Sequence, residues 1–242
     1  MTILKKKKVL TLILSVSLTM ITCGNVFAGT LEDILADLEE NADDVNDISA
    51  NLVIDADDNE YDITSGWVKA KDQATVGTGK FRIHRSQPAT GDLYCDGSDV
   101  EQVGDSSQCT RTSFVTTNYL GWLSRAFRDC DILWILDNYT FSLYGSNVNV
   151  NGTTCKKITS SGYDIYVDIN NYKKTIRIEA KESGNVKRRY TMSNISLVEN
   201  TSYIASNVEA TDSPGDNTVT YDITYSNIDI NENLDDSYFA LP

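Results

Sequence analysis

The feature that most constrains the fold runs from Tyr163 to Ile169, where large apolar and polar side chains alternate one for one. A period of two places the apolar residues on one face of a β-strand and the polar residues on the other. Similar segments, separated by turns rich in Asn, Asp and Gly, continue to Ile230. We therefore expect about ten sequential antiparallel strands along the chain, with one apolar face that needs a cover.

A sheet of this kind should be curved. Neighbouring strands are rotated by roughly 20° relative to each other, so a sheet of about ten strands curls and gains a concave face. Residues 30–41 predict one covering helix, because Thr30 and Asp33 have capping-box spacing. Its apolar stripe is Leu31, Ile34, Leu35 and Leu38. The predicted fold class is α+β, a curved and unclosed antiparallel β-barrel with two or three helices covering the concave face.

The second candidate cover is the stretch 119–139, the densest apolar run after the N-terminal segment. Leu120, Leu123 and Phe127 have the spacing of one helical face. Five large apolar residues then follow without a break over 132–136. A chain this acidic is not expected to leave such a patch in water. The stretch is therefore either ordinary core or a lid that lines or plugs an apolar cavity, and the sequence leaves both interpretations open.

The N-terminus has the pattern of a secretory signal. Four lysines precede an apolar run of 13 residues over 9–21, and Val26-Phe27-Ala28 predicts cleavage after Ala28. That run is too short to cross a bilayer, which needs roughly 20 residues. We expect a periplasmic protein, not integral to the membrane, whose single domain spans 29–242. The alternative is a lipoprotein anchored through Cys23.

The charge balance argues against nucleic acid as a partner. The chain has 21 basic and 35 acidic residues, a net charge of −14. Cleavage after Ala28 removes the four N-terminal lysines, which leaves 17 basic against 35 acidic residues and a net charge of −18. Nucleic acid is therefore an unlikely partner, and an anionic membrane surface should repel such a chain too.

Four cysteines follow the predicted cleavage site, an even number that indicates disulfides in an exported protein. Four cysteines allow three pairings, and we expect neighbours to join, Cys95 with Cys109 across a hairpin and Cys130 with Cys155. None has CxxC spacing and His84 is the only histidine, so no metal site and no cofactor are expected. The chain lacks a nucleophile or base that stands out, so we expect no enzyme activity.

Several segments in order along the chain resemble the periplasmic outer-membrane lipoprotein-sorting family, which has the LolA/LolB-like fold. They are Leu31-Glu-Asp-Ile34, Asp96-Gly97 after an apolar strand, Val167-Asp168-Ile169 with Tyr172-Lys-Lys-Thr-Ile176, and the ending from Tyr225 to Pro242. The resemblance implies an unclosed antiparallel barrel whose concave apolar face, covered by helices, takes up lipid chains.

The expected function is therefore that of an exported carrier whose partners are lipid or lipoprotein acyl chains, with the envelope's lipoprotein-export machinery as a further candidate partner. The alternative is a non-enzymatic structural or sensing module of the envelope whose core is filled by its own side chains. The candidate lipid-binding residues are Trp67, Leu120, Trp122, Leu123, Phe127, Ile132, Trp134 and Leu136.

Overall fold

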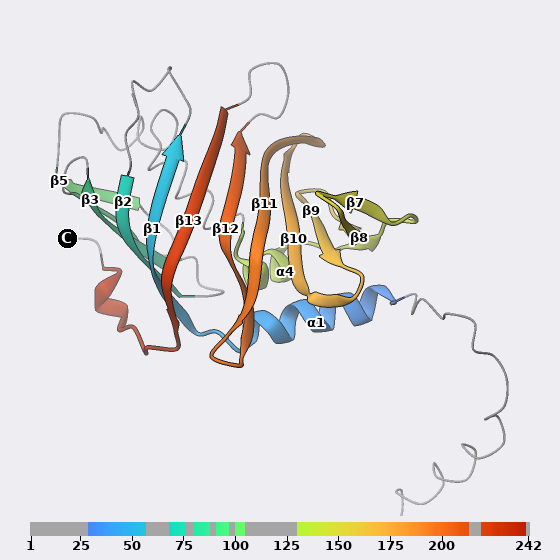
Figure 1. Cartoon of the computed structure of the whole chain (residues 1–242), viewed down its shortest axis with the longest axis horizontal. Coiled ribbons are helices and arrows are strands. Elements are labelled where there is room, and N and C mark those ends of the chain that lie inside the picture. The colour runs from blue at the N-terminus through green and yellow to red at the C-terminus, as the bar shows by residue number, and fades with distance from the viewer. Residues whose placement is uncertain are drawn as a thin grey trace, which may run out of the picture.

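The computed structural model describes residues 29–56, 68–75, 80–87, 91–96, 100–104, 130–212 and 219–240. These residues form one sheet of thirteen strands, in which every pairing is antiparallel. The strand order is β5-β4-β3-β2-β1-β13-β12-β11-β10-β9-β8-β6, and β7 pairs with β8 beside β6. The described sheet is open, because β5 and β6 lie at its two ends (Figure 1).

The bounds of the strands in chain order are β1 Asp47–Ala56, β2 Val68–Thr75, β3 Lys80–Gln87, β4 Gly91–Asp96, β5 Val100–Gly104, β6 Ser142–Leu143, β7 Val148–Val150, β8 Thr153–Thr159, β9 Tyr163–Asp168, β10 Asn171–Glu182, β11 Asn185–Val198, β12 Ser202–Asp212 and β13 Val219–Ile230. The described helices are α1 Leu31–Asp43, α4 Ile132–Asn138 and the short 3-10 helix η1 Asp236–Tyr238.

The predicted fold class is confirmed, a curved and unclosed antiparallel sheet with helices. The strand count differs, since thirteen strands replace the expected ten or so. One reason is β5, a short strand with the sequence VEQVG that lacks a long apolar alternation. Another is that the stretch 148–159 forms two strands, because Asn151 and Gly152 both have positive φ values, 49° and 88°, and turn the chain back tightly.

The first and last strands of the domain pair in the middle of the sheet. β1 lies between β2 and β13, with Leu52 opposite Tyr225 and Ile54 opposite Ile223. The sheet therefore has two flanks that meet only at this seam, β2–β5 on one side and β6–β12 on the other (Figure 1).

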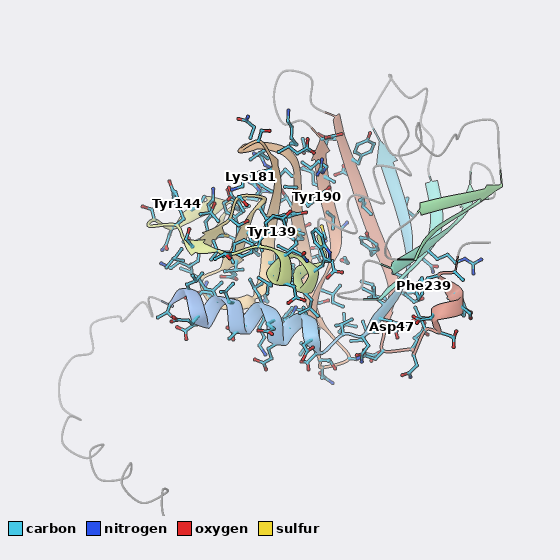
Figure 2. The ribbon with its side chains drawn as sticks, turned by 180° about the vertical axis from the view of Figure 1, so that it is seen from behind. Asp47, Tyr139, Tyr144, Lys181, Tyr190 and Phe239 are labelled. Atoms are coloured by element: carbon cyan, nitrogen blue, oxygen red, sulfur yellow. The ribbon has the colours of Figure 1, made fainter. Side chains whose placement is uncertain are left out.

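Both described α-helices lie on the same face of the sheet, which we call the inner face (Figure 2). α1 crosses the strands near their ends and packs mainly on β10, with further contacts to β12 and α4. Ile34 and Leu38 of α1 are buried, and so is Ile135 of α4. The opposite side of the sheet is the outer face.

The capping box predicted for α1 is confirmed. The Thr30 backbone N–H donates to Asp33 Oδ2 at 2.8 Å, and the Asp33 N–H donates to Thr30 Oγ1 at 3.2 Å. At the other end, the Asn41 side chain accepts from the Tyr203 N–H at 2.7 Å and donates to the Tyr203 carbonyl at 3.2 Å. The helix is thus fixed to the sheet near its C-terminal end, and it ends at Asp43, slightly beyond the expected Asn41.

Removing the cap should weaken the attachment of α1. We expect Thr30→Ala to lower the free energy of unfolding by about 1 kcal/mol, because the Asp33 N–H loses its acceptor. Chemical denaturation monitored by circular dichroism measures the change. The control is Thr30→Ser, which keeps the hydroxyl; a loss in Thr30→Ser as large as in Thr30→Ala would contradict the capping role.

The start of α1 is held against the first residues of β10. The Gly29 N–H donates to the Tyr172 hydroxyl at 3.2 Å. A Cβ atom added at Gly29 would lie 2.2 Å from that oxygen, so only glycine fits here without moving the ring. Residue 29 is thereby placed at the end of the sheet that carries β7–β10 (Figure 1).

The C-terminal tail packs against the first residue of β1, Asp47. The Asp47 carboxylate, buried at 3% exposure, accepts N–H donors from Glu232 at 2.8 Å and Leu234 at 3.1 Å. Farther along the tail, Phe239 is 1% exposed, and the Tyr238 ring lies 5.9 Å from the Arg82 guanidinium carbon. The described part of the ending that carried the family resemblance, residues 225–240, thus packs as part of the domain.

Candidate apolar binding site

The inner face carries a continuous apolar row across six strands. Strand pairing places each residue of the row opposite the next one. Each of these side chains is at most 2% exposed. From β8 to β13, the row is Ile158, Ile165, Ile178, Tyr190, Ala210 and Tyr221. Along β9 the neighbours Tyr163 and Val167 face the same way, as the alternation predicted.

The helices complete this layer from the other side. Ile34 and Leu38 of α1 and Ile135 of α4 belong to the same cluster as the row, and none of them is more than 2% exposed. Close packing of this kind leaves the described centre of the layer occupied by the protein's own side chains. A guest chain could enter it only if the helices move away from the sheet.

The edge of the layer is different, because its large apolar side chains are only partly buried. On α4 these are Ile132, Trp134 and Leu136. The Trp134 ring meets Tyr139 edge-on at 6.1 Å between centroids, and Tyr139 meets Tyr163 at 5.0 Å. We call the four partly buried residues Ile132, Trp134, Leu136 and Tyr139 the aromatic rim, and Tyr163 is the buried residue that Tyr139 contacts. The rim joins the short helix α4 to the buried row and keeps apolar surface within reach of solvent.

α4 is a short cover. It has seven residues, from Ile132 to Asn138, and is capped by Asp131, whose side chain accepts the Trp134 N–H at 3.1 Å. Cys130, just before it, is itself helical, whereas Asp131 is in an extended conformation. The helical conformation is therefore interrupted at Asp131, directly before α4.

Three of the predicted lipid-binding residues are brought together here, namely Ile132, Trp134 and Leu136 of the aromatic rim. The remaining predictions, Trp67, Leu120, Trp122, Leu123 and Phe127, lie outside the described residues. The buried Ile135 was missed, because a run of five apolar residues does not reveal which one faces the sheet. Tyr190 was also missed as a member of the layer.

The predicted Cys130–Cys155 disulfide is not formed in the structure, in which Cys155 is a buried free thiol. The reason is that the two residues belong to different faces. Cys130 packs against the inner cluster, whereas Cys155 lies three residues before the inward-facing Ile158 and points to the outer cluster with Tyr166. Burial, followed by the charge of Asp168, raises the pKa of the Cys155 thiol to about 11. For the other pair, Cys95 lies in β4 and Cys109 lies outside the described residues.

The outer face of β8–β10 holds a buried ion cluster. Asp164 accepts from Lys157 Nζ and Lys181 Nζ, each at 2.7 Å, and from the Thr159 hydroxyl. Burial alone would raise the pKa of Asp164, but these hydrogen bonds outweigh it and hold the pKa below its ordinary value of 3.8. The carboxylate therefore stays ionised and joins three positions on neighbouring strands.

A second polar group adjoins this cluster. Glu179 accepts from the Tyr166 hydroxyl at 2.8 Å and from Arg189 Nε at 2.7 Å. Burial, followed by the hydrogen bond to Glu179, raises the pKa of Tyr166 to about 12, so the hydroxyl remains a donor. The Lys157 ammonium lies 5.2 Å from the Tyr166 ring centroid, and the Arg177 guanidinium carbon lies at 5.8 Å. These contacts fix the side chains of the outer face and involve no side chain of the inner face.

In the described part of the chain, no three His, Cys, Asp or Glu side chains are grouped so that they could hold a metal ion. Among the described helices, none has both the length and the apolar character required to cross a membrane.

The described residues form an α+β fold, an open and curved antiparallel sheet with helices over one apolar face. Comparison with solved structures identifies proteins that share this fold. The sequence matches no family model and, at a significant level, no curated protein sequence. A LolA superfamily protein from Nitrosomonas europaea aligns with a TM-score of 0.61 and 15% identity, covering 88% of this chain and 99% of that one.

Two further structures agree. A DUF1329 family protein from Desulfovibrio piger has a TM-score of 0.56 at 13% identity, over 86% of this chain and 95% of its own. A putative outer membrane lipoprotein-sorting protein domain from Vibrio parahaemolyticus has a TM-score of 0.55 at 12% identity, over 85% and 95%. The chain therefore has a LolA-like fold, as the sequence resemblance implied.

Proposed function

We propose that the protein is an exported, non-enzymatic carrier that binds the acyl chains of lipids or lipoproteins between the inner face of the sheet and its helices. The observation that carries the proposal is the aromatic rim, where Trp134 and Leu136 stay partly exposed beside a fully buried apolar row. The lipoprotein-sorting domain from Vibrio parahaemolyticus has the same fold, which supports this choice of ligand.

An acyl chain would first contact the aromatic rim and would then enter by displacing α4 from the sheet. This helix has one fully buried residue, Ile135, and its seven residues are too few to be stable away from the sheet. An acyl chain that takes the place of α4 against Ile165, Ile178 and Tyr190 would gain a binding free energy of roughly 25 cal/mol for each Å² of apolar surface that it buries. The periplasm is the proposed location, where such a chain would need shielding from water.

Uptake of a fluorescent fatty acid tests the proposal. Protein purified from the expressing cells should raise the fluorescence of the probe in a saturable way, and an acylated peptide should displace it. We expect Leu136→Glu to reduce the affinity by at least about tenfold, because a carboxylate would have to be buried against the acyl chain. Thermal denaturation of each variant shows that the fold is kept.

Asn138→Glu is the matched control, because it adds the same charge to the exposed side of the same helix. Its uptake should equal that of the wild type. If the folded wild-type protein takes up neither the fatty acid nor the acylated peptide, the carrier proposal is wrong.

A structural or sensing module is the second candidate, and the near-complete burial of Ile165, Ile178 and Tyr190 favours it. In that case the layer is filled permanently by the protein's own side chains. The same experiment separates the two functions, because a permanently filled layer gives no saturable uptake, and native mass spectrometry of the purified protein would find no co-purified lipid.

A further inference from the structure

The neighbouring strands β12 and β13 separate from each other toward one end of the sheet. Their pairing stops at Asn207, which lies opposite Thr224. Beyond this pair, β12 runs beside β11 alone and β13 runs beside β1 alone, among the strands that the structure describes. We call the two diverging segments, residues 202–206 of β12 and 225–230 of β13, the fork.

Two asparagines in a left-handed backbone conformation lie where the fork opens. Asn194 of β11 has a φ of 52°, and its side chain donates to Asn207 Oδ1 at 2.8 Å. Asn227 of β13 has a φ of 51° and lies within the register shift between Ser226 and Asp229. An extra residue at such a bulge bends its strand, and asparagine tolerates a positive φ better than most residues do. The sequence itself therefore directs the two strands apart.

The C-terminal end of α1 is bound to the β12 arm of the fork (Figure 1). The Asn41 side chain accepts the Tyr203 N–H and donates to the Tyr203 carbonyl. The N–H and C=O groups of one strand residue point to the same side, so this side of Tyr203 faces away from β11. The side-chain amide of Asn41 therefore binds Tyr203 on the side where β13 would continue the pairing that ends at Asn207.

The connection from α1 to β1 is bound to the β13 arm. Asn231, the residue after β13, donates from its side chain to the Asp44 carbonyl at 2.9 Å and accepts the Asn46 N–H at 2.7 Å. The Asn231 N–H donates to the Asp47 carbonyl at 3.0 Å. Val45, in the middle of the connection, is buried. The end of α1 is thus hydrogen-bonded to both arms of the fork.

Further contacts attach α1 to the sheet along its length. Gly29, just before the helix, is hydrogen-bonded to a side chain of β10. Near the other end, Glu40 forms an ion pair with Lys173 of β10 at 2.7 Å. Between them, Ile34 and Leu38 are buried in the layer on the inner face. Moving α1 away from the sheet would break all of these contacts together.

The second helix, α4, has no comparable attachment. Its side-chain hydrogen bonds are local, from the Trp134 N–H to Asp131 and from the Asn138 side chain to the Trp134 carbonyl at 2.8 Å. Within the described part of the chain, no side chain of residues 132–138 forms a hydrogen bond or an ion pair with the sheet. Ile135 is its one buried residue. A short helix with so few attachments belongs to the part of a structure that opens most readily.

We propose that, of the two described α-helices, α4 alone moves when the binding site is loaded, and that α1 stays bound in the fork as the fixed wall of the site. This inference rests on the proposed function, because it names the element that controls the loading of an acyl chain. Displacing α1 would break its bonds to both arms of the fork and uncover Ile34 and Leu38, whereas displacing α4 uncovers only Ile135 among the buried side chains. The rate of loading should therefore depend on the opening of α4 and not on the attachments of α1.

Amide hydrogen exchange tests this division of roles, first without any ligand. In protein freed of lipid, the N–H groups of Ile135 and Tyr139, both hydrogen-bonded at α4, should exchange at least about tenfold faster than those of residues 35–41 in α1. After addition of palmitate, exchange should change in α4 and stay the same in α1 and at the Tyr203 N–H. Slower exchange in α4 than in α1, or a loss of protection in α1 on loading, overturns the proposal.

Stopped-flow uptake of a fluorescent fatty acid compares the two helices directly. Ile135→Val removes one buried methyl group from α4 and should raise the association rate by about threefold to tenfold, because the helix is held less tightly. Asn41→Ala removes both bonds to Tyr203 and should leave the rate within about twofold of the wild type. Glu39→Ala, at an exposed position of α1, is the control for Asn41→Ala. Faster exchange at the end of α1 in Asn41→Ala, but not in Glu39→Ala, shows that the contact to the fork has been broken.

The kinetic test can also overturn the proposal. It does so if Asn41→Ala accelerates uptake as much as Ile135→Val, or if Ile135→Val remains folded by thermal denaturation and takes up the probe no faster than the wild type. If the wild type takes up no fatty acid, the carrier function is wrong. The exchange of α4 and α1 in the lipid-free protein is measured independently of uptake, so the two failures are distinguishable.

Discussion

Replacing Tyr190 by alanine is expected to lower the free energy of unfolding by about 3–5 kcal/mol, because it removes a large side chain from the centre of a packed layer. Tyr190 is fully buried on β11, with Ile178 and Ala210 as its cross-strand neighbours. A side chain on the wall of an open cavity would lose fewer contacts and cost less. Urea denaturation measures the change in the free energy of unfolding. Its size shows whether Tyr190 belongs to the packed core or to the wall of a binding region.

Tyr144→Ala is the control for this substitution, since it deletes the same atoms from a side chain that is 48% exposed. It should change the stability by less than about 1 kcal/mol. A cost for Tyr190→Ala no larger than for the control would mean that the layer is not closely packed at β11. Acyl chains would then have room in the middle of the sheet, and displacement of α4 would be unnecessary.

Removing the carboxylate of Asp164 is expected to have a comparable effect on the outer face. Asp164→Ala leaves Lys157 and Lys181 without their shared partner, with side chains that are only 18% and 11% exposed. Breaking a buried pair from one side costs about 3–5 kcal/mol, and we expect roughly 3 because both lysines keep some access to water. Asp222→Asn is the control, because it removes an acidic charge at an exposed position of β13.

The same carboxylate predicts a pH dependence with a definite sign. The pKa of Asp164 in the folded protein lies below 3.8, so its stabilising contribution is fully present above that value. It is lost as the pH falls through the folded pKa. We therefore expect the stability difference between wild type and Asp164→Ala to be constant near neutral pH and to shrink below pH 3.8. A difference that persists at acid pH would contradict this ion pairing.

Much of the fold could be predicted because local patterns and tertiary structure agree. The alternation assigned faces correctly from Tyr163 to Val167, and the Thr30 capping box marked the start of α1. The pattern fails where the backbone departs from regular pairing. A register shift between Thr175 and Arg177 places Ile176 in the outer cluster, although its spacing from the inward-facing Ile178 suggested the inner one.

The candidate site was only partly predictable, for two physical reasons. A run of consecutive apolar residues has no periodicity, so it could not single out Ile135 within α4. Disulfide pairing depends on the face that each side chain occupies, and Cys155 lies an odd number of residues from Ile158, which places it on the outer face.

The central pairing of β1 with β13 has a consequence for when the protein can fold. Leu52 and Tyr225, which face each other across this seam, are separated by 173 positions along the chain. Contacts of such long range form late and slowly, because a long loop must close first. Until β13 is available, β1–β5 and β6–β12 remain two half-sheets with unpaired edges next to the seam, and such edges invite aggregation. The whole sheet can therefore fold cooperatively only after β13 has been synthesised. A chain that stops before Val219 should fail to fold at all, instead of folding without one strand.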